Sequence, residues 1–136
     1  MVYLSDGCIV CKSAVLVGDI SIGSGTVVHP FARIIAKTGP VVIGDNNIIE
    51  EMAEVVNDGE RDKVMILGSG NLIGVAASVS SLKMGNNNTV EARASLGRHT
   101  VLPYGCVLTP GEGLQHFWKT QENHRDSLGS WSEPKN

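Results

Sequence analysis

Four histidines could in principle bind a metal ion or move a proton. Three histidines that converge on one metal lower the pKa of a bound water, and one oriented histidine can act as a general base. No two of them have the close spacing of a shared metal site, and His99, beside Arg98, lacks a recognisable carboxylate to orient it. We interpret each as an ordinary surface residue and expect no catalytic residue, metal or cofactor. The four are His29, His99, His116 and His124.

Cys8 and Cys11 have the C-x-x-C spacing of redox pairs and half zinc sites. No second C-x-x-C completes a zinc site, and the repeat described below turns the two side chains in different directions. We interpret Cys8 and Cys106 as small residues that fill the core. Three cysteines without an export signal indicate a reducing compartment, so we expect a cytoplasmic protein.

The positions of these histidines and cysteines depend on a six-residue repeat. Four similar stretches of the sequence recur 21, 24 and 17 residues apart. Each starts with an aliphatic residue or Met, continues with Gly, and has Thr or Asn at its fifth position. A second unit starts six residues later, and its fifth position is Ala every time. This pattern indicates a hexapeptide array with three units per turn. The four stretches start at Ile22, Ile43, Leu67 and Met84.

The repeat predicts an all-β fold with three short strands per turn. A fifth position lies two residues before the next unit start, so the two side chains point to one side of an extended chain. With these pairs inward, the strands close into a triangle, and about five and a half turns stack at roughly 4.8 Å each. Ile20 and the short unit ending at Lys83 do not fit the pattern. The predicted unit starts are Leu4, Val10, Leu16, Ile22, Val28, Ile34, Ile43, Ile49, Val55, Leu67, Ile73, Val79, Met84, Val90, Leu96, Leu102 and Leu108.

Asn47, Asn71 and Asn88 share one phase of the repeat and are expected to lie above one another. Inward amides can bond to each other and to corner carbonyls, which satisfies buried polar groups. A ligand site is the alternative reading. We interpret the three residues as a structural ladder.

Two insertions and a change of composition define the expected organisation. Residues 37–40 predict a short protrusion, and the charged stretch 57–63 is expected to project into solvent. The repeat ends near residue 110, so we expect a β-helix domain over residues 1–110 and a tail over 111–136. Leu114, Phe117 and Trp118 have helix-like spacing, which predicts an irregular or partly helical tail.

One outward face of the predicted prism is apolar. Its column reads Ile9, Val27, Ile48, Leu72, Thr89 and Val107, whereas the column of the next face, Val15, Arg33, Glu54, Ser78 and Ser95, is mostly polar. Apolar stripes on a protein surface usually mark contact surfaces. Folding of the tail over the stripe is the alternative. The proposed partner-binding residues are Ile9, Val27, Ile48, Glu50, Glu51, Glu54, Leu72 and Val107.

The formal net charge is −3 without any cluster of Lys or Arg, which argues against nucleic-acid binding. No segment resembles a transmembrane span or a secretory signal. We therefore expect no membrane insertion.

Two runs, residues 26–51 and 82–88, resemble the dynactin subunit 6 family, whose members are small pointed-end subunits of the dynein activator dynactin. The stretch from Gly39-Pro40 to Glu50-Glu51 is the most specific part of the match. The resemblance implies a left-handed parallel β-helix, an exception to the right-handed crossover rule. It also implies a non-catalytic, cytoskeleton-associated scaffold for dynein-based transport and cargo docking. The implied partners are a sister β-helical subunit and other pointed-end components.

Two other classes of protein remain as alternatives. One is a hexapeptide-repeat enzyme, either a γ-class carbonic anhydrase-like protein or an acyltransferase. The other is a plain homotrimer that takes no part in dynactin.

Overall fold

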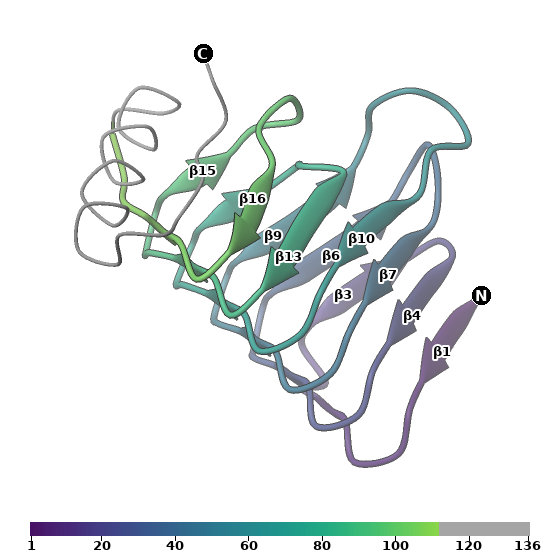
Figure 1. Ribbon diagram of the computed structural model, residues 1–136. Helices are drawn as coiled ribbons and strands as arrows, with labels where there is room; N and C mark the ends of the chain where they lie inside the picture. Colours follow the sequence, from purple (N-terminus) through teal and green to yellow (C-terminus); the bar gives the residue numbers. More distant parts are fainter. Residues whose placement is uncertain (112–136) are drawn as a thin grey trace.

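The computed structural model describes residues 1–111, which form seventeen short strands that all pair in parallel. The chain winds around a triangular prism, and every third strand pairs with its neighbour in the next turn (Figure 1). Within this part of the chain, no helix is long and apolar enough to cross a membrane.

Each side of the prism is one parallel sheet. The first sheet contains β1 (Val2–Leu4), β4 (Ile20–Ile22), β7 (Val41–Ile43), β10 (Met65–Leu67), β13 (Lys83–Asn86) and β16 (Leu102–Tyr104). The second contains β2 (Ile9–Val10), β5 (Val27–Val28), β8 (Ile48–Ile49), β11 (Leu72–Ile73), β14 (Thr89–Val90) and β17 (Val107–Leu108). The third contains β3 (Val15–Val17), β6 (Arg33–Ala36), β9 (Glu54–Asn57), β12 (Ser78–Val79) and β15 (Ser95–Leu96).

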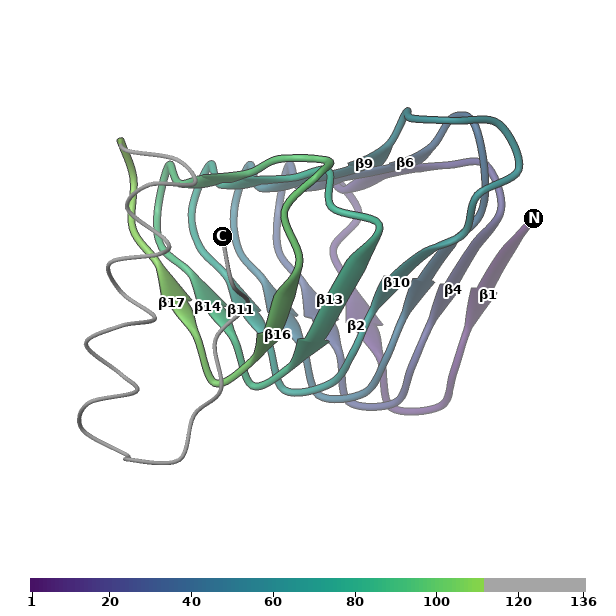
Figure 2. The same cartoon turned by 45° about the horizontal axis from the view of Figure 1, so that its top comes forward.

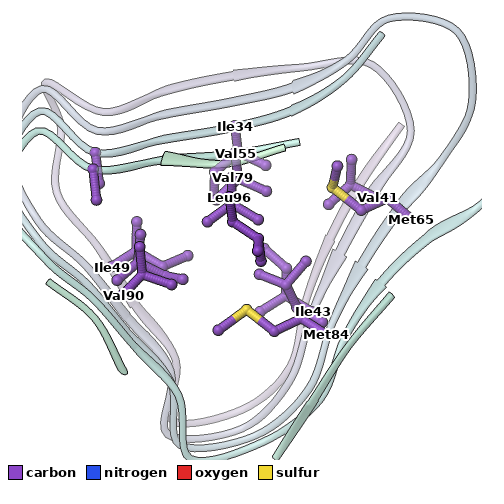
Figure 3. Close-up of a cluster of buried hydrophobic side chains, with 14 of the residues drawn as sticks. Ile34, Val41, Ile43, Ile49, Val55, Met65, Val79, Met84, Val90 and Leu96 are labelled. Carbon is purple, nitrogen blue, oxygen red and sulfur yellow. The ribbon is translucent and has the colours of Figure 1, made fainter. Parts of the chain in front are cut away.

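The winding is left-handed. In the view down the prism, the chain passes from the first sheet at the right to the second at the left and then to the third at the top (Figure 3). It turns clockwise while successive turns approach the viewer, which defines a left-handed helix. The left-handed parallel β-helix expected from the sequence is confirmed.

The core consists of stacked columns of aliphatic side chains. Every strand contains one predicted unit start, and all fourteen starts from Ile22 onward are buried. Figure 3 shows Ile34, Val55, Val79 and Leu96 stacked above one another on the third sheet. Burial of each such side chain contributes roughly 1.5–3 kcal/mol. In the first turn Leu4 is exposed, because only one neighbouring turn of the described chain packs against it.

The three corners differ in the size of their inward residues. Ala32, Ala53, Ala77 and Ala94 fill the second corner, between the second and third sheets, and all four are buried. At the third corner, which leads back to the first sheet, Ile20, Val41 and Met65 pair with one another and are buried. Ile20 also pairs with Val2 in the preceding turn, so it belongs to a column of large residues and is no exception to the fold.

The short unit before Met84 is accommodated at Ser80 and Ser81. Leu82 packs against the core in the inward position, and Lys83 points outward. The buried Ser81 hydroxyl donates to the Lys83 carbonyl at 3.0 Å and accepts from the Lys83 N–H at 3.3 Å. These two bonds close the shorter corner.

Both insertions emerge at the third corner and pack against each other as one protrusion (Figures 1 and 2). The Asp62 N–H donates to the Thr38 carbonyl at 2.9 Å. The Asn57 Nδ2 donates to the carbonyls of Pro40 at 3.0 Å and Lys63 at 2.8 Å. The prediction that the whole stretch 57–63 projects into solvent was wrong for Asn57, which is fully buried in β9 because it ties the two insertions together.

The expectations for Leu114, Phe117, Trp118, His116 and His124 lie outside the described residues, as does the tail beyond residue 111.

Candidate protein-interaction surface

The three predicted ladder residues lie one turn apart and bond in series. Asn47 Oδ1 accepts from the backbone N–H of Asn71 at 2.8 Å, and Asn71 Oδ1 accepts from the N–H of Asn88 at 2.8 Å. Asn88 Oδ1 accepts from the N–H of Cys106 at 2.9 Å, while Thr26 Oγ1 continues the column below by accepting from the Asn47 N–H at 3.2 Å. All five residues are buried.

The other end of each amide is also bonded. Asn47 Nδ2 donates to the Gly68 carbonyl at 2.9 Å, and Asn71 Nδ2 donates to the Gly85 carbonyl at 2.8 Å. Asn88 Nδ2 lies 3.4 Å from the Leu102 carbonyl. Since each side chain already uses its oxygen and its nitrogen within the fold, the ladder is suited to supporting the corner and offers little to a ligand.

The outward apolar column, here called the stripe, consists of Ile9, Val27, Ile48, Leu72, Thr89 and Val107. Pairing of the second sheet places these six residues in a single ladder. Ile9 is 59% exposed and Ile48 is 41% exposed, whereas Val27, Leu72 and Thr89 are half-buried between their neighbours. The stripe is therefore a shallow apolar surface that runs along the prism.

The three glutamates predicted to flank the stripe lie in two different places. Glu50 and Glu51 lie at the second corner, directly after β8. Glu54 lies on the third sheet and accepts from Arg33 Nη1 at 3.0 Å, both side chains being largely exposed. Glu50 and Glu51 thus border the stripe, and Glu54 faces away around the corner.

The candidate chemical residues are spread over the three corners, and Cys11 and His29 lie at the same position of adjacent turns at the second corner. His29 is half-buried at the second corner, whereas His99 is exposed in the turn after β15. Cys8 and Cys11 are both half-buried free thiols, and burial raises the pKa of the Cys8 thiol. Within residues 1–111, no three His, Cys, Asp or Glu side chains converge as metal ligands would.

Some exposed apolar residues lie outside the stripe. Phe31 and Met52 are 62% and 54% exposed at the second corner. Val42 and Ile66 lie next to each other on the outer face of the first sheet and are also exposed. Phe31 and Met52 were not predicted to be exposed, because they stand at corners and a comparison of strand positions does not reveal them.

The protrusion contains a hollow of about 290 Å³ lined by Lys37, Thr38, Arg61 and Asp62. Two cationic side chains and one carboxylate share this lining. The mixture favours neither an anion nor a cation, and we assign the hollow no role.

The sequence of this chain is similar to those of several known proteins. Dynactin subunit 6 of Nematostella vectensis is 43% identical over 111 residues, which cover 75% of this chain and 60% of that protein. Dynactin subunit 6 of Danio rerio is 41% identical over 117 residues, which cover 79% and 60%. The chain is a relative of dynactin subunit 6. The same family name extends to Dictyostelium discoideum, whose dynactin subunit 6 is 33% identical over 105 residues.

The chain spans about 60% of the length of the first two dynactin subunit 6 relatives. No protein-family model matches it. Among solved structures, a hexapeptide transferase family protein from Anaplasma phagocytophilum aligns at 14% identity with a TM-score of 0.47, covering 96% of this chain and 93% of that one. The acetyltransferase domain of PglB from Neisseria gonorrhoeae with acetyl coenzyme A aligns at 18% identity with a TM-score of 0.44, covering 83% and 57%.

Proposed function

We propose that this chain is a non-catalytic scaffold subunit of the dynactin pointed end. The observation that carries the proposal is its 33–43% identity to dynactin subunit 6 proteins from a sea anemone, a fish and a slime mould. As such a subunit it would act in the cytoplasm with the cytoskeleton, supporting dynein-based transport and cargo docking. Its partners would be a sister β-helical subunit and other pointed-end components.

The stripe is the surface that we assign to the partner. It combines Val27, Ile48 and Leu72 in one rigid ladder, where parallel strands hold their spacing fixed. Glu50 and Glu51 border it at the corner. An apolar centre with a charged rim is the usual composition of a protein–protein contact.

Replacing Ile48 and Leu72 by Asp tests this assignment. Both side chains point outward, so the variant should keep the circular dichroism spectrum of the wild type. Burying two carboxylates in an apolar contact is strongly unfavourable. Co-purification with the sister subunit should therefore be abolished.

A matched control places the same two charges on other faces. Ser21→Asp lies on the first sheet and Ser95→Asp on the third, both at outward positions. This variant should bind the sister subunit as the wild type does. If the Ile48→Asp, Leu72→Asp variant also binds normally, the stripe is not the contact surface.

A further inference from the structure

The second corner of the β-helix repeats a left-handed backbone conformation at the same place in successive turns. The residues in this conformation are Phe31 at φ 62°, Met52 at 60°, Ala76 at 57° and Arg93 at 63°. A side chain on an L-residue is strained in this region, and a bulky one is an outlier. Such outliers persist only where the surroundings hold them, and they concentrate at functional sites.

The first corner, between the first and second sheets, uses the same conformation with different residues. There the left-handed positions are Gly7, Gly25, Asn46, Gly70, Asn87 and Gly105. Gly and Asn are the residues that adopt this conformation most readily. The comparison within one molecule shows that the fold needs the backbone turn but does not need a large side chain on it.

Backbone hydrogen bonds hold the second corner in a fixed ladder. The Met52 N–H donates to the Pro30 carbonyl at 3.2 Å, and the Ala76 N–H donates to the Glu51 carbonyl at 3.0 Å. One turn below, the Phe31 N–H donates to Ser13 Oγ at 3.3 Å. The side chains of Phe31 and Met52 are therefore presented one turn apart from a rigid frame.

These side chains face solvent. Phe31, Met52 and Val75 are all exposed to more than a third of their full area, and we call the three residues the corner ridge. None of them belongs to the buried core cluster. Neither burial nor backbone preference accounts for an aromatic ring and a thioether at these positions.

The end of the corner ridge at Phe31 and Met52 has a negative border, whereas at the other end the Arg93 N–H donates to the Val75 carbonyl at 2.9 Å. Glu50 and Glu51 directly precede Met52, and in the described part of the chain neither forms an ion pair. The nearby Arg33 is already bonded to Glu54 on the third sheet. A partner that covers the ridge therefore meets apolar surface next to uncompensated carboxylates.

We propose that the corner ridge is a docking surface for a basic, apolar segment of another protein. Apolar side chains of that segment would cover Phe31 and Met52, and its Lys or Arg side chains would face Glu50 and Glu51. Opposite charges at the rim of a contact favour encounter and set the orientation. This surface adjoins the stripe, and the two share Glu50 and Glu51 as a common border. The inference does not depend on the dynactin proposal.

The test uses a fluorescein-labelled 18-residue helical peptide of Leu and Lys, and a control peptide with Glu in place of Lys. Fluorescence anisotropy with the full chain should show saturable binding of the Leu–Lys peptide that weakens with salt, and no binding of the Leu–Glu peptide. The double variant Phe31→Asn, Met52→Asn should bind the Leu–Lys peptide at least fivefold more weakly. Its melting temperature should rise, because Asn relieves the left-handed strain.

Two further variants locate the peptide. Glu50→Gln, Glu51→Gln should reduce both the affinity and its dependence on salt. Val101→Asn, at an equally exposed apolar residue elsewhere, should change nothing. The Ile48→Asp, Leu72→Asp variant on the stripe should still bind the peptide. The assignment of the stripe and the assignment of the ridge can therefore be rejected independently. Unchanged peptide binding by the Phe31→Asn, Met52→Asn variant, or a fall in its melting temperature, would overturn the proposal.

Discussion

The side-chain oxygen of Asn47 accepts a 2.8 Å hydrogen bond from the backbone N–H of Asn71, one turn further along the β-helix. The same relationship joins Asn71 to Asn88. Each turn is therefore linked to the next at its corner by a buried side chain as well as by its strands. The first corner owes its regular stacking to this series of bonds.

Asn71→Ala should destabilise the protein by about 2–4 kcal/mol. The change leaves the buried N–H of Asn88 without its acceptor and removes the donor to the Gly85 carbonyl, and each buried group left unpaired costs roughly 1–3 kcal/mol. Urea unfolding followed by circular dichroism measures the loss. The surface variant Ser95→Ala should stay within about 0.5 kcal/mol of the wild type. A loss equally small for Asn71→Ala would show that the ladder contributes little.

Two glycines predict opposite effects of the same substitution. A Cβ at Gly85 would collide with the Pro103 carbonyl oxygen in the next turn, so Gly85→Ala should cost at least about 2 kcal/mol. A Cβ at Gly97 would meet nothing within 4 Å, and Gly97 does not have a left-handed φ. Gly97→Ala should be neutral or stabilising by up to about 1 kcal/mol, because Ala restricts the unfolded chain. Thermal unfolding of the two variants provides the comparison, and equal melting temperatures would contradict it.

The repeat could be predicted from the sequence because its two inward columns differ regularly in residue size, one large and one small. A unit start such as Ile49 and a fifth position such as Ala53 must both point inward from extended chain, so residue size alone revealed the register. The ladder of Asn47, Asn71 and Asn88 followed from the same phase. Strand pairing in the structure reproduces that register.

Other features depend on contacts between distant turns and could not be read in this way. Asn57 appeared to begin a solvated loop, yet it is buried because its amide joins the two insertions. Phe31 and Met52 stand in corner positions whose backbone conformation is known only from the folded chain. Nothing in residue type alone separates such a left-handed corner residue from an ordinary turn residue.

The ion pair between Arg33 and Glu54 should contribute less than about 1 kcal/mol, because both side chains are largely exposed and solvent screens them. A double-mutant cycle with Arg33→Ala and Glu54→Ala measures the coupling. The coupling should shrink further in 1 M NaCl, where the screening length is roughly 3 Å. A large coupling that is independent of salt would contradict this description of the pair.

Burial raises the pKa of the Cys8 thiol, which lowers its thiolate fraction near neutral pH. Alkylation of Cys8, followed by mass spectrometry, should therefore reach half its maximal rate at a higher pH than alkylation of N-acetylcysteine. The folded state holds this proton more tightly than the unfolded state does. Its contribution to stability is thus complete below the unfolded thiol pKa and is lost as pH rises through the folded pKa. Equal pH profiles for Cys8 and N-acetylcysteine would contradict the shift.

The set of proteins that co-purify with this chain tests the account most directly. The tagged 136-residue chain should be expressed in cells, purified without denaturation and analysed by quantitative mass spectrometry together with the Ile48→Asp, Leu72→Asp variant. We predict that dynactin pointed-end subunits co-purify in fixed proportion with the wild type and are lost from the variant. Recovery of the wild-type chain without dynactin subunits, with the threefold mass of a homotrimer in light scattering, would contradict the account.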